Sequence, residues 1–155
     1  MQDITEMKKV NSLRKPILLA GAFISLSLYV ISLTREAYCT TAGCEASWSA
    51  ALFGLFFFFA TEANLVWFAN PFFLAALIFS FYSPYKALLL SLVGLSIALS
   101  FLGCDKVLSG GMGGGTFEII KYMSGYWFWV SSIGNIAIFN LLQILLDRRF
   151  SNTHM

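Results

Sequence analysis

One acidic residue stands out chemically because it lies within an apolar stretch. Glu62 is the only charged residue between Ala46 and Tyr85. A carboxylate at membrane depth is costly, which makes Glu62 a candidate for binding a proton or a cation, or for pairing with a basic residue of a partner. The alternative is a structural position near a helix end, hydrated or hydrogen-bonded to Asn64 or to a neighbouring helix. Asn70 is a further polar residue of the same stretch.

The sequence has three cysteines, and all of them flank apolar segments. If they share an oxidising face, Cys39 and Cys44 can close a small loop, or either can pair with Cys104. Their spacing fits no zinc motif, and the single histidine, His154, lies in the polar C-terminal tail. We therefore predict a disulfide, no metal site and no cofactor.

A polar stripe is predicted along the last apolar segment. Its members are Ser132, Asn135, Asn140 and Gln143. At about 100° per residue they fall on one face of a helix. Such side chains bond neighbouring helices together, and the same stripe would line a transport pathway. Because no second charged residue accompanies Glu62, bonding between helices is the favoured interpretation. The run Gly110–Gly115 lacks the lysine of a phosphate-binding loop and is interpreted as a flexible connection.

The composition places these residues in a membrane protein. Hydrophobic residues make up 58% of the 155 residues and charged residues 12%, with a mean hydropathy of +0.75. Soluble domains carry about 25% charged residues. The longest charge-free runs are residues 16–34, 46–61, 63–85, 87–104 and 122–146. These lengths are comparable to the roughly 17–25 residues that cross a bilayer as a helix. The net charge of +2 argues against nucleic-acid binding.

The predicted fold is an all-α polytopic bundle in a single domain, residues 1–155. Four spans are expected, at residues 16–33, 48–82, 87–103 and 125–146, with outer loops at 34–47 and 104–124. The second span is expected to contain a break or a re-entrant segment at Asn70-Pro71. The first span is interpreted as retained rather than cleaved. Within the second outer loop, Thr116–Met123 is predicted to form a short interfacial helix, since Phe117, Ile120 and Met123 recur at helical spacing.

Five spans are the alternative, with 48–82 crossing twice. The four-span arrangement places seven of the ten Lys and Arg residues on the cytoplasmic side, and the five-span arrangement six. We therefore expect both termini in the cytoplasm.

In layout alone, the chain resembles the quinone-coupled disulfide-forming oxidoreductases of bacterial inner membranes. Those four-helix proteins of similar length need two cysteine pairs, one of them Cys-x-x-Cys. Here Cys39 and Cys44 are separated by four residues and only Cys104 remains. The resemblance implies thiol oxidoreductase chemistry at these three cysteines, but the departure removes both the motif and the second pair.

A second resemblance covers roughly residues 48–135. Leu65-Val66-Trp67-Phe68-Ala69-Asn70-Pro71 and Ser124-Gly125-Tyr126-Trp127-Phe128-Trp129-Val130-Ser131-Ser132 contain a Trp-x-Ala-Asn-Pro and a Gly-Tyr-x-x-Trp element. In these elements the chain resembles a group of small, uncharacterised bacterial membrane proteins. The resemblance implies a bacterial inner-membrane location and no particular activity.

These observations favour a non-enzymatic protein that acts through protein–protein interaction in the bilayer. We expect an accessory subunit of a larger membrane complex or an immunity-type inhibitor of a membrane-active toxin, with another membrane protein or a second copy as partner. A small oligomeric transporter or channel that uses Glu62 is the alternative. Disulfide-forming oxidoreductase activity at Cys39, Cys44 and Cys104 is a further one.

Overall fold

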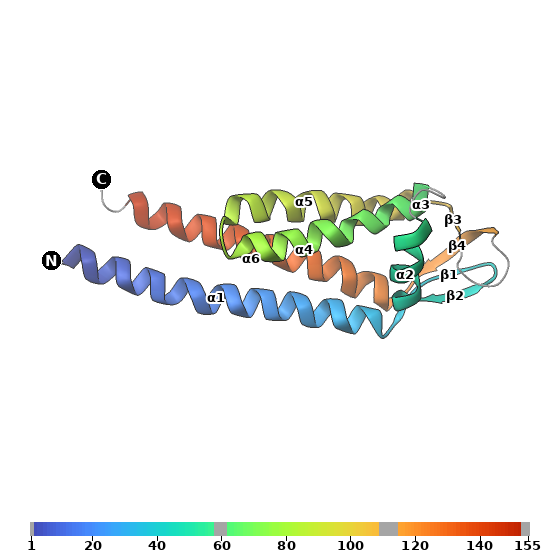
Figure 1. Ribbon diagram of the computed structural model, residues 1–155, viewed down its shortest axis with the longest axis horizontal. Helices are drawn as coiled ribbons and strands as arrows, with labels where there is room; N and C mark the ends of the chain where they lie inside the picture. Colours follow the sequence, from blue (N-terminus) through green and yellow to red (C-terminus); the bar gives the residue numbers. More distant parts are fainter. Residues whose placement is uncertain (1, 58–61, 109–114, 153–155) are drawn as a thin grey trace.

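The protein is an elongated helical bundle with a small sheet at one end (Figure 1). The computed structural model describes the backbone of residues 2–57, 62–108 and 115–152, and the side chains of residues 16–57, 63–108 and 115–149. The long helices are α1 (Gln2–Leu33), α4 (Ala69–Ser80), α5 (Pro84–Ser100) and α6 (Ser124–Asn152). Both ends of the described chain lie at the end of the bundle opposite the sheet.

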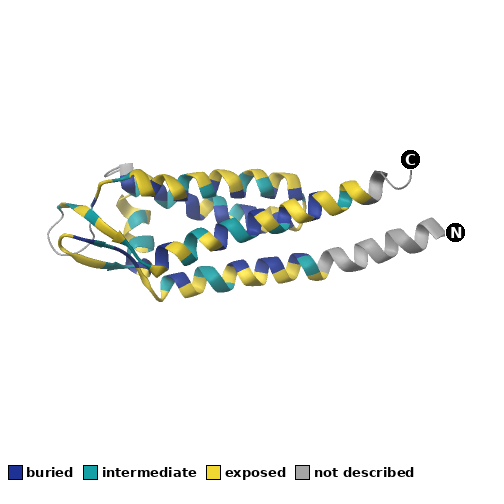
Figure 2. Ribbon diagram, turned by 180° about the vertical axis from the view of Figure 1, so that it is seen from behind, coloured by how far each residue is buried: buried dark blue, intermediate teal, exposed yellow. Residues whose placement is uncertain are grey.

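Four helical segments are long and apolar enough to cross a membrane, as the sequence predicts. They are Pro16–Leu33, Ala63–Ser80, Pro84–Gly103 and Ser124–Arg149. The second segment combines α3 (Glu62–Leu65), the 3-10 helix η1 (Val66–Phe68) and α4, and the third continues from α5 into the 3-10 helix η2 (Phe101–Gly103). The outward faces of these helices are largely exposed (Figure 2), which fits contact with lipid.

The predicted break at Asn70-Pro71 is wrong in position. The helical path changes at η1, and Pro71 is the third residue of α4. A proline in the first turn costs no helical hydrogen bond, because the first N–H groups of a helix have no partner within it. The rest of the predicted 48–82 span contains α2 (Ser47–Phe57), a shorter apolar helix lying across the sheet end of the bundle (Figure 1).

The prediction of an all-α fold is confirmed only in part, because the chain is mostly helical but its two outer loops form an antiparallel sheet. Its strands are β1 (Glu36–Thr40), β2 (Gly43–Ala46), β3 (Lys106–Leu108) and β4 (Thr116–Tyr122), in the order β2-β1-β4-β3. The segment predicted as an interfacial helix, Thr116–Met123, is therefore mostly strand β4. Tyr38 of β1 pairs with Tyr122 of β4, which joins the two loops.

Two groups of buried apolar residues hold the structure together. The first lies between the helices and contains four alanines with Phe73, Leu77, Ile133 and Ile136. Small residues let membrane helices approach closely, where dispersion contacts stabilise their packing. The second group lies where the sheet meets the bundle, around Tyr38, Val66, Phe101 and Tyr126. The sheet is thus packed onto the helices as a cap.

Candidate functional site: the sheet-capped end

The hairpin of the cap is closed covalently. Cys39 and Cys44 are paired residues of β1 and β2 and form a disulfide, with their Cα atoms 3.9 Å apart. The two-residue connection Thr41-Ala42 leads to Gly43, whose φ of +142° is a conformation that residues with a side chain rarely adopt. Of the pairings that the sequence left open, the structure contains this one.

Cys104 is not part of that disulfide. It follows η2 and stays a thiol, whose Sγ lies 3.8 Å from the Ser100 carbonyl oxygen. Among the described residues, one group has the spacing of possible metal ligands, and it consists of Cys39, Cys44 and Glu36. Because both sulfurs are bonded to each other, this group offers no thiolate to a metal ion.

Helix α2 is fixed across the end of the bundle by two polar side chains of the following segment. The indole Nε1 of Trp67 donates to the Ala51 carbonyl oxygen at 2.7 Å, and the Nδ2 of Asn64 donates to the Phe57 carbonyl oxygen at 3.0 Å. A Cβ added to Gly54 would clash with the Trp67 ring, so the glycine permits this close approach. Asn64, singled out from the sequence as polar, therefore satisfies a carbonyl at the end of α2.

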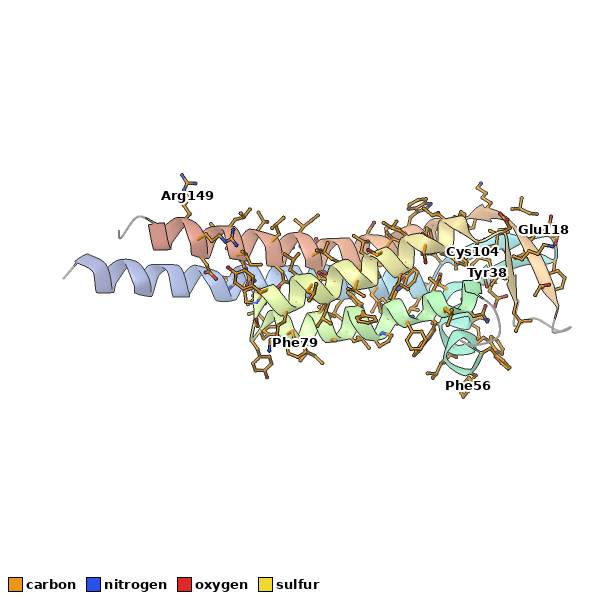
Figure 3. The ribbon with its side chains drawn as sticks, turned by 90° about the horizontal axis from the view of Figure 1, so that it is seen from above. Tyr38, Phe56, Phe79, Cys104, Glu118 and Arg149 are labelled. Atoms are coloured by element: carbon orange, nitrogen blue, oxygen red, sulfur yellow. A yellow bond between two sulfur atoms is a disulfide. The ribbon has the colours of Figure 1, made fainter. Side chains whose placement is uncertain are left out.

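The opposite face of α2 presents large apolar side chains outward. Trp48, Leu52 and Phe56 recur every four residues on this face, and their side chains are 57%, 53% and 73% exposed. Figure 3 shows Phe56 pointing away from the bundle. The sequence alone could not place α2 at the sheet end, since that position depends on the contacts of Trp67 and Asn64.

The cap contains one buried and one half-buried tyrosine close to acidic groups. Tyr38 points into the junction between sheet and bundle (Figure 3) and is only 6% exposed. Burial, and secondarily the nearby negative charge of Glu45, raises the pKa of Tyr38 well above its ordinary value. Burial also raises the pKa of Tyr122, with smaller contributions from Cys104 and Asp105. Both phenols are therefore neutral hydrogen-bonding groups at physiological pH.

The polar stripe of α6 bonds the helices together at two positions. Asn135 donates through Nδ2 to Ser25 Oγ at 2.8 Å and to the Gly21 carbonyl oxygen at 3.2 Å, both on α1. Asn140 donates to Ser80 Oγ of α4 at 2.8 Å. Ser132 donates to the Trp129 carbonyl oxygen of its own helix. The Oε1 of Gln143 is buried without a hydrogen-bond partner.

Asn70 and Glu62 fall at different levels of the second span. Asn70 is buried at the start of α4, where its Oδ1 accepts hydrogen bonds from α1 and α6. Glu62 begins α3, at the end of the bundle that carries the sheet, but its side chain lies outside the described residues. His154 and most of the glycine run, up to Gly114, also lie outside them.

The site thus combines a disulfide-closed hairpin, a four-stranded cap and a rigidly held helix with an exposed aromatic face. No protein-family model matches the chain, and neither a curated protein nor a solved structure shows significant similarity to it.

Proposed function

We propose that this membrane protein acts by binding another membrane protein at its sheet-capped end. It would serve either as an accessory subunit of a larger membrane complex or as an immunity-type inhibitor of a membrane-active toxin. The supporting observation is the outward face of α2, with Trp48, Leu52 and Phe56 exposed on a helix held by hydrogen bonds from Trp67 and Asn64.

A preorganised aromatic face suits protein recognition for two physical reasons. Large aromatic side chains contribute most of the binding free energy at many interfaces. In addition, a helix that is already fixed loses little conformational entropy when a partner binds. The cap presents β2 and β3 at its two edges, and an unpaired strand edge offers backbone groups to the same partner.

The polar side chains inside the bundle are better explained by packing than by transport. The donors of Asn135 and Asn140 are used in bonds to α1 and α4, and Asn70 links three helices. A transport path needs polar groups that can exchange their partners with a passing substrate. The Cys39–Cys44 disulfide joins neighbouring strands of one hairpin, as expected of a structural crosslink.

We further propose that the protein lies in a bacterial inner membrane with both termini in the cytoplasm. Lys86, Arg148 and Arg149 belong to the end of the bundle where the termini lie, as does the basic N-terminal segment, in keeping with the positive-inside rule. The opposite end carries the disulfide, which persists in an oxidising compartment. A reporter that is active only in the cytoplasm should then be active when fused after Met155, and a reporter that is active only in the periplasm should be inactive there.

The partner proposal is tested by placing a photo-crosslinking amino acid at Phe56 and, as the control, at Phe23. Both side chains are highly exposed, at 73% and 72%, but Phe23 lies within the α1 span. The native host should yield a stoichiometric partner crosslinked from position 56 and not from 23. Phe56→Ala should lose that partner in a mild-detergent purification, while Phe23→Ala retains it.

A purified homo-oligomer without a partner would contradict the proposal and favour the transporter alternative, with Glu62→Gln as the next variant. If a partner is found, expressing the protein without that partner distinguishes the two roles. An immunity protein should protect cells from the toxin without other components, whereas an accessory subunit should be degraded or inactive without its complex.

A further inference from the structure

A cavity of about 120 Å³ lies beneath α2, where the sheet meets the bundle. Its walls include Tyr29 and Ser32 from the last turn of α1, Tyr126 and Trp129 from the start of α6, and residues of β1, β2, α2 and η1. At about 1.5 Å per residue, these helix residues lie within roughly 8 Å of the helix ends. The cavity is therefore at the level where the bilayer meets water.

The walls of the cavity are largely aromatic. Seven lining side chains carry aromatic rings, among them Tyr38, Trp67, Tyr126 and Trp129. The faces of aromatic rings carry partial negative charge and attract cations, and sites that bind alkylated ammonium groups are commonly enclosed by such rings. An aromatic wall also accepts any apolar group, so the charge and polarity of the remaining lining must decide which ligand fits.

Glu45 is the one residue with a formal charge in the described lining, which includes no Lys, Arg or His. Its carboxylate accepts a hydrogen bond from Ser49 Oγ. The lining thus carries one negative charge and no positive charge, which favours a cationic ligand and disfavours an anionic one.

One polar group in the same walls lacks a partner. Ser47 Oγ is buried and forms no hydrogen bond with a described residue. Buried polar groups are usually paired, with protein or with a bound molecule. A purely apolar ligand would leave this hydroxyl without a partner.

We propose that this cavity binds an alkylated ammonium group, either of a free organic cation or of a zwitterionic lipid headgroup. A cavity of roughly 150 Å³ in another protein holds a benzene molecule, so about 120 Å³ suits a trimethylammonium group. The aromatic rings surround the alkyl substituents and Glu45 balances the charge. The proposal is independent of the partner surface, because it concerns the inner face of α2 and not the outward face around Phe56.

The test compares choline with 3,3-dimethylbutan-1-ol, its uncharged analogue of the same shape, using tryptophan fluorescence of the detergent-purified full chain. Trp67 and Trp129 line the cavity and report on its occupation. Choline should bind saturably and at least about tenfold more tightly than the alcohol, as expected from one cation–π or carboxylate contact. Equal binding of both compounds, or no saturable binding of choline, would overturn the proposal.

Amino-acid substitutions test whether Glu45 causes the preference for choline over its uncharged analogue. Glu45→Gln should remove the tenfold preference for choline, whereas Glu118→Gln should keep it, since Glu118 is an exposed carboxylate of the same sheet that pairs with Lys106 at 3.9 Å. Ser47→Ala provides a second variant that leaves the charge in place and should weaken choline binding by a smaller factor. A preference that survives in Glu45→Gln would show that the site lies elsewhere and overturn the assignment.

The two sources of the ammonium group are distinguished in nanodiscs. Choline binding in phosphatidylglycerol nanodiscs that persists unchanged in phosphatidylcholine nanodiscs identifies a site for a free cation. Binding that is lost in phosphatidylcholine identifies the lipid headgroup as the occupant, because the headgroup then competes with choline. Absence of choline binding in phosphatidylglycerol nanodiscs would contradict both forms of the proposal.

Discussion

The side chain of Asn70 accepts a hydrogen bond from the indole Nε1 of Trp129 at 2.9 Å and so joins α4 to α6. The same Oδ1 accepts the Tyr29 hydroxyl of α1 at 3.3 Å, while its Nδ2 donates to the Trp67 carbonyl oxygen at 3.1 Å. One amide therefore connects three of the four candidate spans at the level just below the cap.

Replacing this amide should destabilise the bundle. Asn70→Ala leaves the Trp129 indole and the Tyr29 hydroxyl without their acceptor, and we expect the free energy of unfolding to fall by about 1–3 kcal/mol. The measurement is thermal unfolding in a mild detergent, followed by near-UV circular dichroism. Asn64→Ala is the matched control, because the Asn64 side chain bonds only to the end of α2. Its loss should leave the thermal unfolding midpoint of the bundle nearly unchanged. Equal losses in the two variants would contradict the central role of Asn70.

Two amides of the α6 stripe should respond in opposite ways to replacement by leucine. Asn135→Leu removes bonds to Ser25 and Gly21 and should destabilise the protein by about 0.6–2 kcal/mol. Gln143→Leu removes a buried Oε1 that has no partner and should be neutral or stabilising. Unfolding midpoints measured side by side test this pair. A strong loss of biological activity in Gln143→Leu with intact stability would instead support a transport pathway.

The junction between the cap and α6 depends on a glycine. A Cβ added to Gly125 would clash with Ser47 Oγ and with the Glu36 carbonyl oxygen. Because a backbone atom is involved, Gly125→Ala should force the cap away from the bundle and lower the free energy of unfolding by about 1–3 kcal/mol. Gly134→Ala is the control in the same helix, since nothing lies within 4 Å of its added Cβ. Faster amide hydrogen exchange in β1 and β4 should accompany the first substitution only.

The disulfide should stabilise the hairpin without being required for partner binding. The chain-entropy treatment of such a short loop predicts a loss of about 2 kcal/mol when Cys39 and Cys44 are both replaced by serine. Partner binding through α2 should persist, and Cys104→Ser should have little effect. Alkylation of the unfolded, unreduced protein should modify one cysteine, and alkylation after reduction should modify all three. Loss of activity in the triple serine variant with unchanged stability would support thiol chemistry instead.

The long spans were predictable from the sequence because the bilayer imposes a length and an apolar composition on any helix that crosses it. The cap was not predictable in the same way. Phe117, Ile120 and Met123 recur at a spacing of three, which fits a helix, yet Thr116–Tyr122 pairs with β1 and forms a strand. The β-branched Thr116, Ile119 and Ile120 were the local sign of a strand. The segment becomes a strand because it pairs with β1, which lies far away in the chain, and a local sequence pattern contains no information about that pairing.

The cavity and the support of α2 could not be predicted for a related reason. The sequence shows Asn64 as a polar residue and Trp67 as part of the Trp-x-Ala-Asn-Pro element. The roles of both come from carbonyl groups that lie seven and sixteen residues earlier. Glu45 and Tyr38 carry no motif and become neighbours only because β1 pairs with β2. The polar stripe of α6, in contrast, was visible in the sequence because helix periodicity alone places its members on one face.

The strand order of the cap also sets the sequence of events during synthesis. Strand β1 is made early, directly before its hairpin partner β2, whereas its other neighbour, β4, immediately precedes the last helix. During the seconds in which the ribosome makes the intervening spans, one edge of β1 stays open. The sheet is completed only when the chain directly before α6 has reached the same side of the bilayer. Closure of the cap therefore requires that the spans before β4 are already in place, and a chain that stalls before β4 exposes an edge that quality-control proteases can recognise.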